Sequence, residues 1–253
     1  MFRKLVLSIA LCPLIVASVV AQSAPLSTIL YYKFETGPNG AQVQSAVDSG
    51  PFGLTGAVTG ALTYSNNVPK GGGKFSLNAT PDVDYIVLAQ TQSNSALLNQ
   101  TQNFMLSVFA EPTGGTTLDD IGDLIAGKLI SNGSGSCLTT YAILYSAFTN
   151  KFVGGVCGAD GSTRFMQSAH TFPLNSGWYK VALKYTTKGA MTTISLTVNS
   201  KMEGKIKLKS FPGPALGNAG FQVGASNFVC DTCQFRRNFI GYIDDVKLAG
   251  QAP

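Results

Sequence analysis

The sequences FIGYIDDVKL (residues 239–248) and LYYKFE (residues 30–35) show the strongest strand character in the chain. In the second of them, Leu30, Tyr32 and Phe34 alternate with the side chains between them, which is the two-residue period of a half-buried β-strand. They are the first and last predicted strands. We therefore expect them to pair or to lie side by side, and so to close one domain.

Strand periodicity continues along almost the whole chain. Further strand-like runs cover residues 74–77, 85–88, 104–110, 123–130, 141–146, 151–157, 178–186, 193–199, 205–208 and 221–224. Clusters of Gly, Pro, Asn and Asp separate these runs, and the only helix predicted is a short one around residues 95–100. Many short strands without helical crossovers predict an all-β, two-sheet antiparallel sandwich. No internal repeat or long linker divides residues 22–253, so we expect a single domain.

The first residues predict export. Arg3 and Lys4 precede an almost wholly apolar run, residues 5–16, and small residues lead up to Ala21. This is the pattern of a secretory signal peptide, and we place cleavage after Ala21, with Ala24 as the alternative site. The apolar run is shorter than the roughly 20 residues of a membrane-spanning helix, so stable membrane insertion is not expected. The predicted localisation is secreted and extracellular.

Composition supports a folded chain with many turns. Charged residues make up only 12 % of the sequence, apolar residues make up 45 %, and there are 28 glycines, which together indicate a large core rather than disorder. The net charge of +5 falls by two when the signal peptide leaves. Such a weak and dispersed charge does not favour a nucleic-acid partner. The sequence leaves the oligomeric state open.

Four cysteines remain after Cys12 leaves with the signal peptide. An even number in an oxidising compartment predicts two disulfides, for which three connectivities are possible. We favour Cys137–Cys157, since these residues flank a strand–turn–strand pattern, together with Cys230–Cys233. The latter pair would suggest zinc or redox chemistry in a cytosolic protein, but the chain has no second CxxC and only one histidine.

Three N-glycosylation sequons are consistent with export. They begin at Asn78, Asn99 and Asn132. Their use would make the protein a glycoprotein and would place the three asparagines in surface loops.

Six segments carry a family pattern in the expected order. They are LYYKFE (30–35), DSGPFG (48–53), FMLSVFAEP (104–112), WYKVALKY (178–185), ISLTVN (194–199) and FIGYIDDVKL (239–248). Together they resemble the laminin G-like jelly-roll domain of the concanavalin A-like lectin/glucanase superfamily. Departures are Pro51 and Phe52 in the loop, the missing tryptophan of the third segment, and Ser200 where a glycine is usual. The resemblance implies a concanavalin A-like jelly roll.

The resemblance also implies a structural Ca²⁺ at one end of the sandwich. The matching residues are Glu35, Asp48, Asp244 and Asp245, whose oxygens are the ligands that Ca²⁺ prefers. The alternative is that these acids are turn formers and solvated strand ends. A second acidic group, at residues 119, 120 and 123, is expected to be solvated.

The motifs for catalysis are absent. Glycosidases of this superfamily carry paired acids at strand spacing, but Glu35, Glu111 and Glu203 have no such partner. Lyases need a base with a neutralising cation, and His170 has no lyase signature around it. No Gly-x-Ser-x-Gly elbow is present. We therefore lean against an enzyme without excluding one of an unfamiliar kind.

A lysine row is one candidate binding surface. Lys201, Lys205, Lys207 and Lys209 alternate with apolar residues, so one strand would present a basic row outward. Such a row suits sulfated or uronic-acid glycans, but lysines also protect edge strands from aggregation, and we favour protection.

Aromatic residues are the other candidate contacts. Stacking platforms for sugar rings are predicted at Tyr31, Tyr141, Tyr145 and Tyr179. Phe228, Phe235, Arg236 and Arg237 surround the CxxC in a loop rich in contact-type residues. The alternative is that this loop packs on its own sheet.

The sequence therefore favours a secreted module that binds a glycan or an extracellular protein, with Ca²⁺ as a candidate structural ion. Two alternatives remain open: a polysaccharide lyase or hydrolase on the same fold, and a purely structural surface protein. Function depends on the site, which the fold does not identify.

Overall fold

The computed structural model describes residues 25–82, 84–117, 119–130, 139–230 and 233–251, and the side chains of residues 227–236 lie outside that description. The described residues form seventeen strands and one short helix, α1 (Ser95–Leu98). No helix among them is both long and apolar enough to cross a membrane. The regular structure of the described residues is thus almost entirely β, as predicted.

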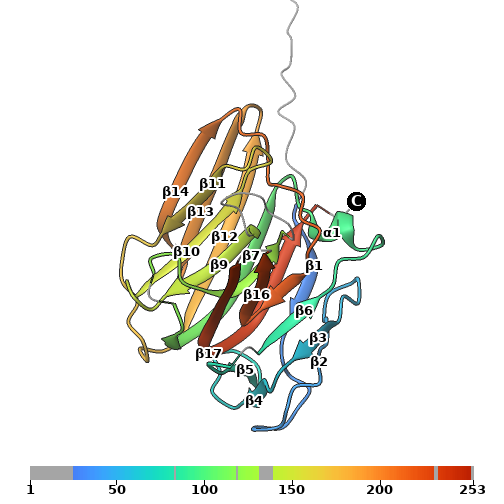
Figure 1. Ribbon diagram of the computed structural model, residues 1–253, viewed down its shortest axis with the longest axis vertical. Helices are drawn as coiled ribbons and strands as arrows, with labels where there is room; N and C mark the ends of the chain where they lie inside the picture. The colour runs from blue at the N-terminus through green and yellow to red at the C-terminus, as the bar shows by residue number, and fades with distance from the viewer. Residues whose placement is uncertain (1–24, 83, 118, 131–138, 231–232, 252–253) are drawn as a thin grey trace, which may run out of the picture.

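One antiparallel sheet, sheet A, is built around the long last strand. Its members are β1 (Ser27–Tyr32), β4 (Thr63–Ser65), β5 (Ser76–Ala79), β7 (Phe104–Gly115), β12 (Tyr179–Lys188), β13 (Met191–Val198), β14 (Lys201–Lys209) and β17 (Cys233–Gly250). The order is β4–β5–β17–β7–β12–β13–β14, and β1 pairs with the C-terminal part of β17. Figure 1 shows β12, β13 and β14 side by side at one margin of the molecule.

The other sheet, sheet B, contains β2 (Ser45–Ala46), β3 (Gly56–Thr59), β6 (Tyr85–Leu88), β8 (Asp123–Leu129), β9 (Thr139–Ser146), β10 (Lys151–Cys157), β11 (Thr163–Gln167) and β15 (Phe221–Val223). The order is β2–β3–β6–β15–β8–β9–β10–β11. β16 (Ala225–Cys230) forms a hairpin with the start of β17, and Asn238 of that hairpin pairs with Leu124 of β8. β17 thus belongs to both sheets.

The main core lies between the two sheets and receives alternate side chains from both. Phe104 of sheet A is completely buried, and its ring stacks on Tyr185 with centroids 5.3 Å apart. The same ring lies 4.8 Å from that of Tyr141, which comes from sheet B. Aromatic contacts of this kind join the sheets and fix their separation.

The predicted closure by the first and last strands is confirmed. Leu30 of β1 lies opposite Leu248 of β17, and Tyr32 lies opposite Val246. The short helix is also confirmed, although it ends at Leu98. β2, β3, β4, β11 and β16 were not predicted from the sequence. β2 and β4 are only two and three residues long, which is too short for an alternation to be recognised.

Candidate functional site

The outer face of sheet B, which faces away from the main core, carries a second apolar cluster. β8, β9 and β10 are buried on both faces: Ile143 points into the main core, while Leu124, Leu144 and Val153 point outward and are at most 3 % exposed. Leu129 and Ala142 complete the cluster, and the Phe165 side chain packs against it. The outer face of sheet B is therefore apolar and largely shielded from water, with Phe165 and Ala219 packed against it.

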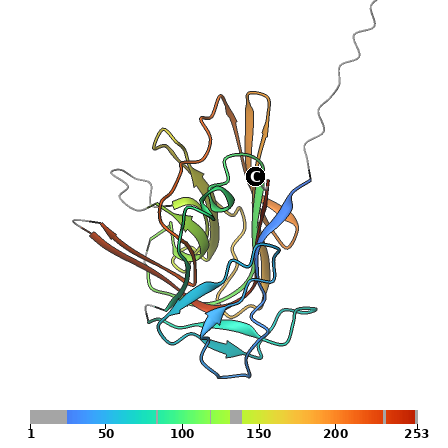
Figure 2. The same cartoon turned by 90° about the vertical axis from the view of Figure 1, so that its right-hand side faces the viewer.

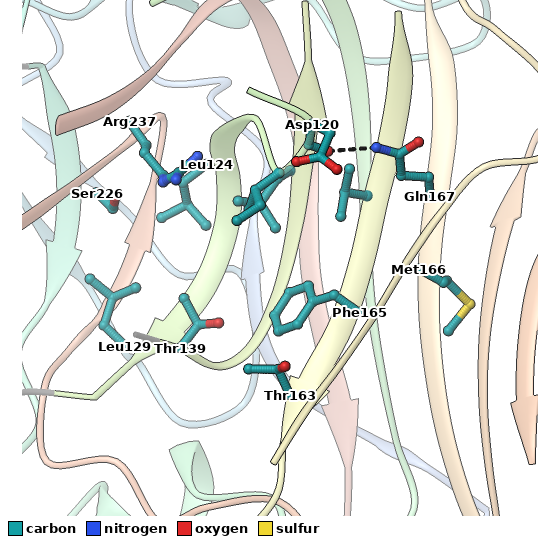
Figure 3. A pocket seen from close by; sticks show the side chains of 13 residues that line it. Asp120, Leu124, Leu129, Thr139, Thr163, Phe165, Met166, Gln167, Ser226 and Arg237 are labelled. Carbon is teal, nitrogen blue, oxygen red and sulfur yellow. Dashed lines mark hydrogen bonds between the residues drawn. The ribbon is translucent and has the colours of Figure 1, made fainter. Parts of the chain in front are cut away.

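A cavity of about 470 Å³ opens over this apolar face. Its floor is Leu124, Leu129, Leu144 and Val153. Polar side chains form the rim, as Figure 3 shows: Asp120, Thr139, Thr163, Gln167, Ser226 and Arg237. An apolar floor with a few convergent polar groups is the usual composition of a ligand pocket. We call this cavity the sheet B pocket.

The β16–β17 hairpin provides one wall of the pocket and projects away from the body of the molecule (Figure 2). Arg237 attaches it to the loop before β8. The guanidinium donates to both carboxylate oxygens of Asp119, at 3.0 and 2.8 Å, and to the carbonyl oxygen of Gly122 at 2.7 Å. Two parallel charge-assisted hydrogen bonds fix the direction of the Arg237 side chain as well as adding energy.

The Asp119 carboxylate is held in its charged form by these contacts. Partial burial acts to raise the pKa of Asp119, but the hydrogen bonds from Arg237 and from the Gly122 amide, with the Arg237 charge, outweigh it and lower the pKa below its usual value. Arg237 itself is only 11 % exposed as a side chain. The pocket wall is therefore a formed ion pair rather than a free cation.

β11 provides the opposite wall. Phe165 turns its half-buried ring toward the floor, and Gln167 reaches the rim, where its amide nitrogen donates to the Asp120 carbonyl oxygen at 2.7 Å (Figure 3). β11 pairs with β10 alone among the described strands. An edge strand of this kind presents its side chains where a ligand has access.

Sequence reasoning missed Phe165 and Gln167 because β11 was not predicted. The signal was present in the alternation of Thr163, Phe165 and Gln167, which share one face of β11. A second signal was that apolar residues occur on both faces of β8, β9 and β10 rather than at alternate positions only, a pattern of strands covered on both faces.

The prediction that Tyr141 and Tyr145 act as stacking platforms is wrong. Both side chains are completely buried in the main core. Their hydroxyl groups donate to the carbonyl oxygens of Leu98 and Phe172 at 2.8 and 2.7 Å, so the rings are fixed inside the protein. Their bulk and their buried hydroxyls serve packing between the sheets.

The other two tyrosines are half-buried. Tyr179 packs against the core, with edge contacts to Phe152 and Phe172. The ammonium groups of Lys33 and Lys247 lie over the Tyr31 ring, 4.8 and 5.5 Å from its centroid. Neither tyrosine borders the sheet B pocket.

The remaining predicted contacts are dispersed. Lys205 and Lys207 are exposed on β14, far from the pocket in strand order. Arg237 lines the pocket wall. The side chains of Phe228, Phe235 and Arg236 lie outside the described part of the chain.

His170 and the arginines with a described side chain, Arg164 and Arg237, do not converge. His170 Nδ1 lies 3.0 Å from the carboxylate of Glu203 on β14, which is almost fully buried. Arg164 donates to the neighbouring Thr163 carbonyl, and Arg237 is paired with Asp119.

The four acids predicted to hold Ca²⁺ do not form the expected set. Asp48 instead accepts hydrogen bonds from the backbone amides of Tyr31, Gly50 and Leu54, and Glu35 accepts from the amide of Lys74. Within the described ranges, no three His, Cys, Asp or Glu side chains are grouped so as to hold a metal ion. The carboxylates of Asp48 and Glu35 are thus hydrogen-bonded to backbone amides.

Asp244 is the exception among these acids. Its side chain is 1 % exposed; one oxygen accepts the Asp245 amide at 2.8 Å, and the other has no hydrogen-bond partner. Burial, with the nearby negative charges of Asp245 and Glu35, raises the pKa of Asp244 to about 7. The Asp245 carboxylate accepts the Tyr31 hydroxyl at 2.6 Å.

The predicted surface modifications have mixed outcomes. Asn78 lies in β5 rather than in a loop and is half-buried, so the expected loop position is wrong. Asn99 follows α1, where its amide oxygen accepts the Gly217 amide at 3.0 Å. Asn132, Cys137 and the predicted signal peptide lie outside the described residues.

The described residues form a β-rich domain with a cavity on the outer face of one sheet. No protein-family model matches the sequence, and no curated protein matches it either. Solved structures do share the fold. They include the binding domain of Paraclostridial Mosquitocidal Protein 1 (TM-score 0.58, 12 % identity) and a botulinum neurotoxin type C structure described by its interaction with two ganglioside molecules (TM-score 0.55, 16 % identity).

In both cases the match covers 90 % of this chain and 49 % of the toxin chain, so this chain spans about half the length of those structures. A third similar structure is the CBM40 of a Ruminococcus gnavus IT-sialidase bound to α2,6 sialyllactose, with TM-score 0.50, 11 % identity, and coverage of 88 % and 92 %. At these identities the similarity shows the fold alone.

Proposed function

We propose that this protein is a secreted glycan-binding module that takes its ligand in the sheet B pocket. The observation that carries the proposal is the cavity itself, in which Arg237, Gln167 and Asp120 surround an apolar floor. Sugars present both hydroxyl groups and apolar C–H faces. A pocket with a half-buried phenyl ring and a polar rim complements both.

The similar structures support this reading from another direction. One is described by its interaction with two ganglioside molecules, although this chain matches only 49 % of it, and another, matched over 92 % of its length, is bound to α2,6 sialyllactose. The proposal extends glycan binding to this chain, through residues of its own.

We also propose a more specific fold, the laminin G-like jelly roll. Two antiparallel sheets that share one core and are joined through β17 support a concanavalin A-like jelly roll of the laminin G-like kind.

Export and glycosylation are part of the proposal on the sequence patterns alone. Cys230 and Cys233 are direct backbone partners at the end of the hairpin, a register that suits a Cys230–Cys233 disulfide, and the Cys137–Cys157 bond stays a prediction.

We also propose a structural Ca²⁺, now at a site centred on Asp244 rather than on all four predicted acids. It rests on the buried, unpartnered oxygen of Asp244 beside the charges of Asp245 and Glu35. A hard cation would offset the burial of this carboxylate.

Replacing Phe165 by alanine tests the glycan proposal. Loss of the ring removes one wall of the pocket and its contact with sugar C–H groups, so affinity for the bound glycan should fall by about tenfold, which is 1.4 kcal/mol. The measurement is retention of the mature chain on a glycan array, followed by titration of the strongest binder.

The matched control is Phe148→Ala, because Phe148 is 65 % exposed and does not line the pocket. It should leave affinity unchanged within about twofold. Retention of no glycan at all, or equal losses for both variants, would count against the proposed function.

A further inference from the structure

The outer face of sheet A carries a surface that the sheet B pocket does not use. Strands β12, β13 and β14 lie side by side, and alternate residues of each point away from the core. Six exposed lysines share this outward face: Lys180, Lys184 and Lys188 on β12, and Lys205, Lys207 and Lys209 on β14. We call this surface the lysine face.

The register arranges these lysines in two rows. Ser195 of β13 lies opposite Lys184 on one side and opposite Lys205 on the other. Strands two apart in a sheet are about 10 Å apart, and same-face residues along a strand are spaced by about 7 Å. Between the rows, β13 presents short hydroxyl side chains, including Thr193 and Thr197. Two rows of long cationic side chains therefore flank a lower polar strip.

The charge of the lysine face is not cancelled locally. No outward position of β12, β13 or β14, all of which the structure describes, is an aspartate or a glutamate. Across the described residues, none of the six lysines forms an ion pair. Lys180 lies over the ring of Phe109, 5.5 Å from its centroid, and so extends the basic surface toward β7.

Protection of a sheet edge does not account for this arrangement. β14 is an edge strand of sheet A, so its lysines are consistent with protection against aggregation. β12, however, is paired on both sides, with β7 and with β13. Lysines on an interior strand protect no edge, which leaves Lys180, Lys184 and Lys188 to be explained by another role.

We propose that the lysine face binds a linear anionic polysaccharide, laid along β13 with its sulfate or carboxylate groups directed to the two lysine rows. The ammonium groups neutralise charges on both sides of the polymer, and the β13 hydroxyls hydrogen-bond to its sugar hydroxyls. This surface lies on the sheet opposite the pocket and does not depend on the proposed pocket ligand.

The outward side chains favour a polysaccharide over an anionic membrane. Surfaces that enter a bilayer interface carry Trp, Phe or Leu beside their basic residues. The large apolar side chains on the outward face of these strands are Met191 and Met202, which lie near opposite ends of the β13 strip. The strip between the rows thus offers hydroxyl groups rather than groups that insert into lipid.

The test is the triple variant Lys184→Gln, Lys205→Gln, Lys207→Gln in the full mature chain. Its affinity for heparin, for an unsulfated polyuronate and for neutral dextran is measured at low and at physiological salt. We expect the parent protein to bind one or both anionic polymers but not dextran, more weakly at higher salt. The variant should lose at least about tenfold in affinity, since the surface charge that attracts the polymer is removed. The two anionic arms show whether sulfate or carboxylate is preferred.

The matched control is Lys70→Gln, Lys74→Gln, Lys151→Gln, which removes the same charge from outside the lysine face. It should change affinity by less than about twofold. Equal losses for the two triple variants, no binding to either anionic polymer, or tighter binding to phosphatidylserine vesicles or duplex DNA would overturn the proposal. Phe165→Ala should leave polymer affinity unchanged, so failure of the pocket proposal and failure of this one are distinguishable.

Discussion

Replacing Asp244 by asparagine is expected to increase the free energy of unfolding near neutral pH and above. In the folded protein the Asp244 carboxyl has a pKa raised to about 7 by its burial and by the charges of Asp245 and Glu35. Its pKa in the unfolded chain is about 3.9. Ionising this group therefore costs more in the folded state than in the unfolded state.

The direction of the pH dependence follows from this difference. Below about pH 4 the carboxyl is protonated in both the folded and the unfolded state, so its raised pKa does not lower the free energy of unfolding. As the pH rises toward 7, the unfolded state has lost its proton while the folded state still binds one, so stability falls. Over the whole interval the loss is about 4 kcal/mol as an upper bound, at 1.36 kcal/mol per pKa unit.

Asparagine retains the acceptor for the Asp245 amide and carries no charge. It also leaves an amide group where the unpartnered oxygen was, which costs about 1–3 kcal/mol. We therefore expect a net gain of roughly 1–3 kcal/mol near pH 8 and a loss near pH 4. Urea unfolding of the parent protein and the variant at pH values from 4 to 8 measures the gain and the loss. Parallel pH profiles for the two proteins would contradict the prediction.

Calcium titration of the same pair tests the proposed ion. A cation bound by Asp244 would raise the Tm of the parent protein near pH 8 and leave that of the asparagine variant unchanged, because ligands stabilise only the state that binds them. EDTA should reverse the shift. A Tm that is insensitive to Ca²⁺ in both proteins would remove the ion from the proposal.

The Arg237→Ala variant is expected to lose both stability and glycan affinity. It breaks two hydrogen bonds to the Asp119 carboxylate and one to the Gly122 carbonyl, which together hold the β16–β17 hairpin against the loop before β8. Because the Asp119 side chain is 41 % exposed, we expect a loss of only about 1–2 kcal/mol in the free energy of unfolding. Affinity should fall by more than about tenfold, since the wall of the pocket is no longer fixed.

Two measurements separate this effect from a general loss of charge. Arg164→Ala removes an arginine whose recorded hydrogen bond reaches only the adjacent Thr163 carbonyl, and it should change neither quantity appreciably. In Arg237→Ala the pKa of Asp119, followed by NMR, should rise because its main charge partner is gone. An unchanged Asp119 pKa would show that the ion pair does not form in solution.

More of the fold than of the candidate sites could be predicted from the sequence. The alternation in residues 30–35 and 239–248 was sufficient to predict the β1–β17 pairing, since alternate residues of both segments enter the core: Leu30 and Tyr32 of β1, and Val246 and Leu248 of β17. The same alternation placed Lys205 and Lys207 outward. Lys184 joined them only in the folded sheet, because residues that are distant in sequence become neighbours through strand order.

The surroundings of the predicted Ca²⁺ ligands could not be predicted from residue type. The Asp48 carboxylate accepts the amides of Gly50 and Leu54 in its own loop and that of Tyr31 in β1, and a sequence motif does not show such contacts. Tyr141 is likewise an aromatic residue of the kind that stacks on sugars, but the fold buries it completely in the core.

The sequence by itself determined the strand content, the two-residue alternation that separates core from surface, and the pairing of the terminal strands, because these depend on side-chain periodicity within each segment. The tertiary structure determined which strands become neighbours and which of their faces pack together. It placed the base of the β16–β17 hairpin beside the sheet B pocket, where Arg237 reaches Asp119, and it set lysine-bearing strands on both sides of β13. Both sites arise from contacts between segments far apart in the chain, and those contacts are fixed by packing of the whole domain rather than by any local pattern.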